Sequence, residues 1–408
     1  MNKVITRTLL ALVGLTMLAF TAQAQSTPPS GTPYITMTVT NGATVQIAMW
    51  AAADSTPVWV ETSPGSYAHV TVGSTYWTSF LNYTANDTTV KVHGNLKGFI
   101  CERNTTNLTG LTFSSGLTNL QYLYCDNNSI TSLDVSGLTN LKLLACDSNF
   151  LTSLDVSELT NLRGLWCYNN SITSLNVSGL TNLEDLHCNT NSLTTLDVSG
   201  LTNLKTLGCS CNFLTSLDVS GLTNLKSLSC DSNFLTAFDA SGLTSLERLW
   251  CFSNPFSTQA IDDIYCSLPQ RTAADSVVIY PDLAGTAADH DIVLATNKQN
   301  ATDKNWQVLY YGDDTDIPTT GTYECGTTGI ADITAAEQLS IYPNPAKDMV
   351  TVELNESHKG VLQIVDISGK TLISHKINGT HVSVNVSTLS KGMYFVKVGS
   401  KVNKLIIE

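Results

Sequence analysis

The sequence predicts a mainly β protein. A solenoid of parallel strands is expected in the middle, flanked by an N-terminal β-sandwich-like domain and a C-terminal antiparallel β-sandwich. Two observations carry this prediction: cysteines that recur every 21 residues in the middle of the chain, and short alternating runs of Thr, Val and aromatic residues on either side. A chain of 408 residues is also too long for one ordinary core. The predicted parts are a signal peptide (1–24), an N-terminal β-rich domain and cap (25–95), eight repeats (96–256), a C-terminal cap and linker (257–330) and a separate C-terminal domain (331–408).

The repeat unit is read directly from the cysteine spacing. Seven cysteines are separated by 21 residues each, with an irregular copy around Cys101 before them. Leu123 and Cys125 alternate with Tyr122 and Tyr124, which is the pattern of a strand with one buried face. An asparagine follows each cysteine at the third position. We expect these two columns to be a structural ladder, formed by Cys125, Cys146, Cys167, Cys188, Cys209, Cys230, Cys251, Asn128, Asn149, Asn170, Asn191, Asn212, Asn233 and Asn254.

The unit, L-T-N-L-x-x-L-x-C-x-x-N-x-[IL]-T-x-L-D-V-S-G, resembles the leucine-rich repeat family, with Cys in place of one leucine. The short, 21-residue form is most similar to the bacterial internalin-type repeats. Seven consecutive copies meet the family pattern. The resemblance covers residues 96 to about 260 and implies a solenoid with its strands stacked along one side.

The ladder residues have two possible roles. Stacked cysteines could bind metal, but equivalent positions on successive coils lack convergent tetrahedral geometry, so we interpret them as small core residues. A buried asparagine amide satisfies backbone groups of the adjacent turns. Cys211 occupies a position that is Asn, Ser or Thr in other copies, and is either an exposed thiol or sequence drift. Cys266 and Cys325 lie outside the ladder, and we expect a disulfide bond between them.

A second column consists of aspartates in the turn that follows each strand. Stacked carboxylates could bind cations along this edge, or each could accept hydrogen bonds from the Ser-Gly turn that follows it, which is the favoured interpretation. The column contains one asparagine, Asn176, and its aspartates are Asp134, Asp155, Asp197, Asp218 and Asp239.

The two ends of the chain predict export. Lys3 and Arg7 precede an apolar run over residues 8–20 and a small-x-small site at 22–24, as in a secretory signal peptide. Residues 331–408 predict seven short strands. Three motifs there, at 342–348, 365–370 and 391–398, resemble the C-terminal sorting domain of the type IX secretion system of Bacteroidetes. The resemblance implies a secreted protein, either attached to the outer-membrane surface or extracellular, whose residues 331–408 engage the type IX secretion machinery.

Composition excludes several classes of function. The net charge of −13 opposes binding of nucleic acid or anionic lipid heads. Beyond the signal peptide no stretch of 18 apolar residues predicts a transmembrane segment. The seven histidines are scattered, and no motif typical of catalytic, phosphate-binding or metal sites is present. We therefore expect no enzymatic activity, no cofactor and no metal.

The strand positions that point away from the core are free to serve a partner. Exposed Trp, Tyr and Arg residues are typical anchors of recognition surfaces, so we expect a protein or glycan ligand at the cell surface. The alternatives are a structural or spacer protein without a specific ligand, and, less favoured, a secreted hydrolase. Trp50, Trp59, Tyr76 and Trp77 are either a sugar-stacking platform or, preferably, core. The candidate ligand-binding residues are Tyr122, Tyr124, Trp166, Tyr168, His187, Arg248, Trp250 and Phe252.

Overall fold

The computed structural model describes residues 27–283, 290–325, 339–366, 370–398 and 401–408. These residues fall into two compact units, Met1–Cys325 and Gly326–Glu408, and each unit has its own hydrophobic core. The predicted signal peptide, residues 1–24, lies outside the described residues.

The N-terminal region of the first unit is built from antiparallel strands, as its alternating sequence predicts. One sheet has the order β4-β3-β6-β1-β8. Its members are β1 (Tyr34–Val39), β3 (Thr56–Ser63), β4 (Ser66–Val72), β6 (Thr89–His93) and β8 (Leu108–Phe113). Strands β2 (Thr44–Ala51) and β5 (Leu81–Thr84) instead join the long sheet of the solenoid. Because β8 belongs to the first repeat but pairs with β1, packing is continuous across residue 95, where the sequence suggested a domain boundary.

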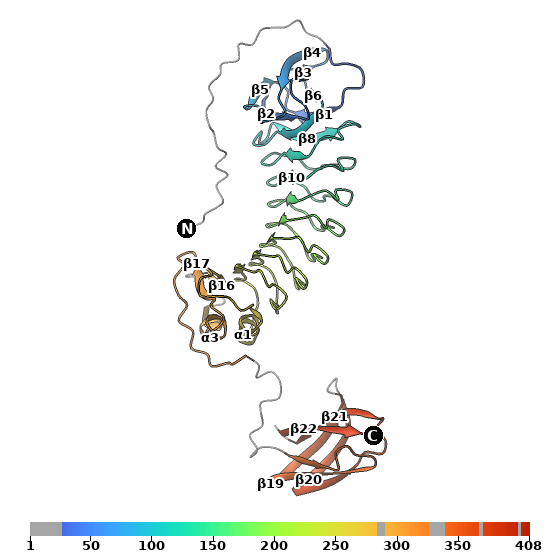
Figure 1. Cartoon of the computed structure of the whole chain (residues 1–408), viewed down its shortest axis with the longest axis vertical. Helices are drawn as coiled ribbons and strands as arrows, with labels where there is room; N and C mark the ends of the chain where they lie inside the picture. Colours follow the sequence, from blue (N-terminus) through green and yellow to red (C-terminus); the bar gives the residue numbers. More distant parts are fainter. Residues whose placement is uncertain (1–26, 284–289, 326–338, 367–369, 399–400) are drawn as a thin grey trace. The chain divides into compact units, whose positions relative to one another are not determined.

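Ten parallel strands form the solenoid sheet, and Figure 1 shows them stacked along one side of the coils. Neighbouring strands pair in step, so that Leu123, Leu144 and Leu165 lie side by side and face the core. The strands are β7 (Leu96–Ile100), β9 (Tyr122–Tyr124), β10 (Leu143–Ala145), β11 (Gly164–Trp166), β12 (Asp185–His187), β13 (Thr206–Gly208), β14 (Ser227–Ser229), β15 (Arg248–Trp250), β16 (Val278–Leu283) and β17 (Gln307–Tyr311).

The cysteine column is buried inside the coils, and so is the asparagine column except for Asn170, which is partly buried. Each ladder cysteine is at most 1% exposed. The Asn149 Nδ2 donates hydrogen bonds to the carbonyls of Cys125 and Cys146 at 3.0 and 3.1 Å, and its Oδ1 accepts one from the Ile130 amide at 3.0 Å. The other ladder asparagines repeat this arrangement along the stack. One amide thus ties two coils together, as the sequence analysis expected.

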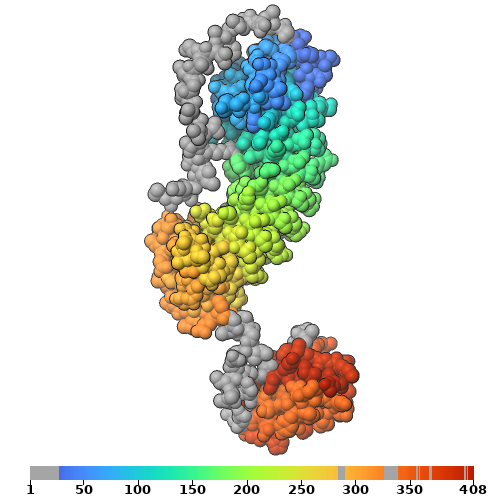
Figure 2. All heavy atoms as spheres, in the orientation of Figure 1, coloured from blue at the N-terminus to red at the C-terminus, as the bar shows by residue number. Residues whose placement is uncertain are grey.

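The C-terminal end of the first unit continues the parallel sheet rather than forming only a cap and linker. Strand β16, which the sequence did not predict, pairs with β15, and β17 pairs with β16. Three helices accompany these strands: α1 (Thr258–Ser267), α2 (His290–Leu294) and α3 (Gln299–Thr302). Cys266 at the end of α1 is joined to Cys325 by the expected disulfide bond. Figure 2 shows this region, in orange, closing one end of the coils.

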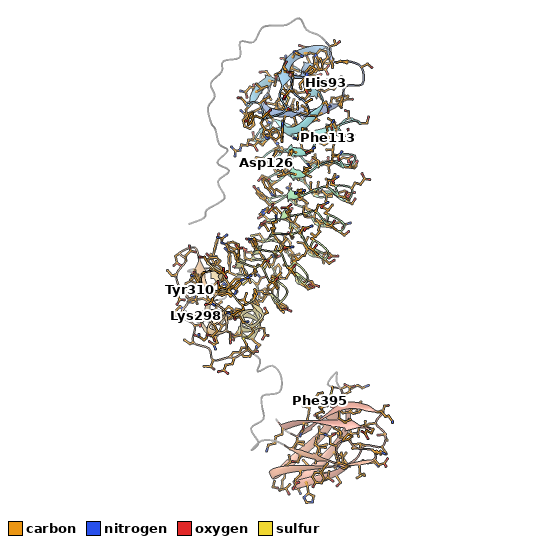
Figure 3. All side chains as sticks on the ribbon, in the orientation of Figure 1. His93, Phe113, Asp126, Lys298, Tyr310 and Phe395 are labelled. Atoms are coloured by element: carbon orange, nitrogen blue, oxygen red, sulfur yellow. A yellow bond between two sulfur atoms is a disulfide. The ribbon has the colours of Figure 1, made fainter. Side chains whose placement is uncertain are left out.

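The second unit is a single antiparallel sheet of five strands, not a sandwich of seven short strands. They are β18 (Ser340–Tyr342), β19 (Met349–Val365), β20 (Thr371–Asn385), β21 (Gly392–Val398), which contains Phe395 labelled in Figure 3, and β22 (Lys401–Ile407). Strands β19 and β20 each merge two of the predicted runs, and their pairing shifts register between Glu353 and His358. Such an irregularity bends the pair, so one sheet encloses its own core.

Candidate functional site

The outward side of the parallel strands, here called the strand face, is where the sequence placed the ligand. Each strand presents its first and third residues on this face and buries its second, as in Tyr122-Leu123-Tyr124. Since the pairing is in step, equivalent side chains of successive coils lie in columns about 4.8 Å apart. The composition of each column therefore decides what this surface presents to a partner.

Aromatic rings form a continuous row over the N-terminal half of the strand face. Tyr124 lies between Trp77 and Trp166, with ring centroids 5.9 and 6.5 Å apart, and Trp166 meets His187 at 6.3 Å. Trp50 is stacked on Tyr122 at 5.3 Å and meets Trp77 at 5.7 Å. This aromatic row, defined as Trp50, Trp77, Tyr122, Tyr124, Trp166 and His187, brings together four of the residues predicted from sequence.

The sequence analysis preferred Trp50 and Trp77 as core residues, but both are only partly buried and extend the aromatic row. Trp77 is seated on Gly98 of β7, where a Cβ atom would lie 2.4 Å from the indole ring. The Lys97 Nζ lies 3.9 Å from the centroid of a Trp50 ring, as a cation over the aromatic face. The N-terminal region thus supplies part of the surface. In the sequence, the only indication of this contact was Gly98, a glycine among larger residues of the strand.

A hollow of about 440 Å³ opens beside the row, above Gly164 of β11. Gly164 pairs with Leu143 and Asp185, and its lack of a side chain leaves the space between them open. This volume lies within the range of small-ligand pockets, roughly 300–1,000 Å³. We call it the Gly164 hollow. It is lined by Tyr122, Lys142, Leu143, Arg163, Gly164, Trp166, Glu184 and Asp185.

Two further predicted residues, Tyr168 and His187, belong to these coils but do not line the hollow. Tyr168 is 39% exposed and follows β11 on the opposite side from Arg163. His187 is partly buried, and burial lowers its pKa, so the neutral imidazole is favoured near neutral pH. It therefore contributes an aromatic surface rather than a positive charge.

The predicted residues on and beside β15, Arg248, Trp250 and Phe252, are only partly available to a ligand. Phe252 is 6% exposed, because its ring stacks on Tyr311 at 4.8 Å, and so its assignment to the ligand surface is wrong. Trp250 is likewise stacked on Tyr280 of β16 at 5.7 Å. The sequence analysis missed this because it ended the sheet at β15. Arg248 remains exposed and borders a second hollow of about 460 Å³.

The buried thiols and the aspartate column offer no obvious chemistry. Burial raises the pKa of every ladder thiol, that of Cys188 to about 12, which keeps the thiols protonated. Cys211 is an exposed free thiol. Asp134, Asp155, Asp197, Asp218 and Asp239 each accept a hydrogen bond from the amide of the serine two residues later.

The described residues contain no group of three or more His, Cys, Asp and Glu residues arranged to hold a metal ion. In the same part of the chain, no helix has the length and apolar character needed to cross a membrane.

Two family models match the chain. Residues 202–241 match the model of leucine-rich repeats in two copies, and residues 340–408 match the secretion system C-terminal sorting domain. The chain therefore carries leucine-rich repeats and a sorting domain of the type IX secretion system. The sorting domain directs the protein to the cell surface or the extracellular space. No curated protein matches the chain.

Solved structures with similar coils include the functional domain of InlJ from Listeria monocytogenes, which contains a cysteine ladder. It is 19% identical over 80% of this chain and 94% of that chain, with a TM-score of 0.34. TLR13 in a complex with ssRNA13 is 26% identical over 49% of this chain and 30% of that chain, with a TM-score of 0.39. A chain of the octameric complex of Latrophilin 3, Unc5D and FLRT2 is 21% identical over 42% of this chain and 65% of that chain, with a TM-score of 0.33.

Proposed function

We propose that this protein is a cell-surface binding protein that recognises a protein or glycan through its strand face. The observation that carries the proposal is the Gly164 hollow, which lies beside Tyr122 and Trp166 in the aromatic row. Rigid strands hold both side chains, so little conformational entropy is lost when a ligand orders them. The hollow places aromatic surface beside charged groups, a combination that suits recognition of a polar ligand with an apolar face.

The competing function is a spacer whose repeats only pack and display. One observation favours it: Tyr122 and Tyr124 contact Trp50 and Trp77, so part of the aromatic row also fixes the N-terminal region to the first coils. The Gly164 hollow distinguishes the binding function from the spacer function, because packing alone does not require an open space there.

A variant that fills the hollow tests the proposal. In Gly164→Phe, the new Cβ would approach Leu143 at 3.4 Å, an ordinary contact, so the ring should enter the hollow without unfolding the coil. The mature protein is used for a glycan array and for a pull-down from cell-surface extracts. We expect Gly164→Phe, and the double variant Trp166→Ala with Tyr168→Ala, to reduce ligand capture at least about tenfold.

The matched control is Ser227→Phe, which adds the same ring in the same column three coils away. It should bind like the unmodified protein, and circular dichroism should show all variants folded. Equal capture by Gly164→Phe and the unmodified protein would favour the spacer.

A further inference from the structure

We propose that the ligand of the strand face is an acidic glycan, with a sugar ring in the Gly164 hollow and its carboxylate or sulfate groups on a basic edge beside it. This inference rests on the proposed binding function and specifies its ligand class. It follows from three features of the described residues: the placement of basic side chains, the burial of the acids opposite them, and the polarity of the rest of the strand face.

Basic side chains are concentrated in the column that immediately precedes the strands. Of the seven Lys and Arg residues in the repeats, five occupy this column, and its only acids are Glu184 and Glu247. We call this column the basic edge; its charged members are Lys97, Lys142, Arg163, Glu184, Lys205, Lys226 and Glu247. In a chain with a net charge of −13, such a concentration at one edge indicates a local positive field.

The two acids of the basic edge neutralise only part of it. Glu184 is shared between Arg163 at 3.2 Å and Lys205 at 2.6 Å, and Glu247 pairs with Lys226 at 2.9 Å. Within the described part of the chain, Lys142 makes no ion pair, although it lines the Gly164 hollow. One of the two cations that line the hollow is therefore available to an acidic group of a ligand.

The acids at the other ends of the strands are withdrawn from solvent. Asp126, labelled in Figure 3, is 4% exposed, Asp147 is 2% exposed and Asp231 is 8% exposed. Asp231 accepts hydrogen bonds from the hydroxyls of Ser210 and Ser229 at 2.7 and 2.8 Å. The basic side chains Arg163, Lys205 and Lys226 are instead 65%, 54% and 57% exposed. Inside the Gly164 hollow, the acids Glu184 and the partly exposed Asp185 balance Lys142 and Arg163, so the positive charge that a ligand meets lies along the basic edge beside the hollow.

The polarity of the strand face favours a glycan over an acidic protein segment. Protein interfaces have a core that is depleted of charged residues, whereas four charged side chains surround the Gly164 hollow. Beyond the aromatic row, the face presents Thr206, Ser227 and Ser229. Among the described repeats, Phe150, Phe213 and Phe234 are also exposed, but each follows a ladder asparagine, beyond the strand face. Aromatic faces beside polar groups suit a sugar, which has an apolar ring face and a polar rim.

Binding measurements with paired probes test the ligand class. The probes are oligogalacturonate and its methyl ester, chondroitin sulfate and its desulfated, esterified form, and poly-glutamate. We expect at least one acidic glycan to bind, its neutral counterpart to bind at least about tenfold more weakly, and added salt to weaken the acidic ligand.

Three variants locate the charge contacts. Lys142→Glu with Arg163→Glu should reduce acidic-glycan affinity at least about tenfold. Arg103→Glu, a charge reversal at a 74% exposed side chain beyond the other ends of the strands, is the matched control and should change it less than about twofold. Glu184→Gln frees Arg163 and Lys205 from their shared acid. It should raise affinity for the acidic glycan several-fold and clearly more than for the neutral form, a difference that a purely structural ion pair would not produce.

Several outcomes would overturn the inference. Equal binding of acidic and neutral forms would remove the role of charge, and tighter binding of poly-glutamate than of every glycan would assign the face to an acidic protein. If all glycans fail but a protein is captured and Gly164→Phe abolishes its capture, the ligand class is wrong while the binding function stands. If nothing is captured at all, the binding function fails as well.

Discussion

Single aspartates in the solenoid turns act as local hydrogen-bond acceptors. Hydrogen bonds from the serine two residues later lower the pKa of Asp134, Asp155, Asp197 and Asp218. At the equivalent place, Asn176 accepts the same bond from the Ser178 amide at 3.0 Å, so the bond needs an oxygen and not a charge. This supports the turn role over cation binding.

These pKa shifts give the turns a defined pH dependence. A carboxylate with a lowered folded-state pKa stabilises the fold above its unfolded pKa of about 3.9, and this contribution is lost as the pH falls through the lower folded value. Replacing all four aspartates with asparagine should keep the acceptor and flatten the fall in melting temperature below about pH 4. Glu158→Gln, at an exposed position in a turn, is the control and should leave the curve unchanged. An equally steep fall in the fourfold variant would contradict this explanation.

At the scale of the repeat, two asparagine columns make different contributions. The ladder amides are inside the coils. From the second L-T-N-L segment on, the asparagine of the segment instead bonds a threonine carbonyl of the preceding coil from an exposed position, as Asn161 does to Thr139 at 3.0 Å. The sequence shows both columns with equal regularity. Burial is what separates them energetically, because water replaces a lost hydrogen bond only at the exposed site.

Asn149→Ala would leave the buried Ile130 amide without its acceptor, while the carbonyls of Cys125 and Cys146 keep the amides of Asn128 and Asn170 as donors. An unsatisfied buried group costs about 1–3 kcal/mol, so we expect a loss of stability of about that size. Asn161→Ala should cost less than about 1 kcal/mol. Urea unfolding followed by circular dichroism measures both. Similar losses in the two variants would mean that the buried ladder contributes no more than the exposed one.

The repeats were predictable from sequence because the residues that recur every 21 positions are also the residues that are buried. A leucine or cysteine every second residue in a strand, repeated every 21 residues, fixes both register and core. Neither strand β16 nor the burial of Phe252 was predictable in this way. Residues 278–283 carry no copy of the repeat, and only the fold brings Tyr311 over Phe252. The Gly164 hollow also required the structure, since a glycine alone does not show which neighbours surround it.

In the whole molecule, the proposed recognition surface and the sorting domain belong to separate units. The strand face and its hollow lie in Met1–Cys325, and the sorting domain lies in Gly326–Glu408. Each unit buries its own apolar residues, Leu165 and Leu186 among those of the first and Val352 and Ile364 among those of the second. Changes in one unit should therefore leave the fold of the other intact.

Deletion of residues 326–408 should separate the two roles. The remaining unit keeps its core and its disulfide bond, so its melting temperature should change by no more than about 2 °C, and purified protein should bind ligand as the full chain does. Without the sorting domain, however, the protein should remain in the periplasm instead of reaching the cell surface or medium, as fractionation and immunoblotting would show. Gly164→Phe in the full chain is the reciprocal control, because it should be exported normally and lose ligand capture. Export of the shortened chain, or retention of Gly164→Phe, would show that delivery depends on the first unit as well.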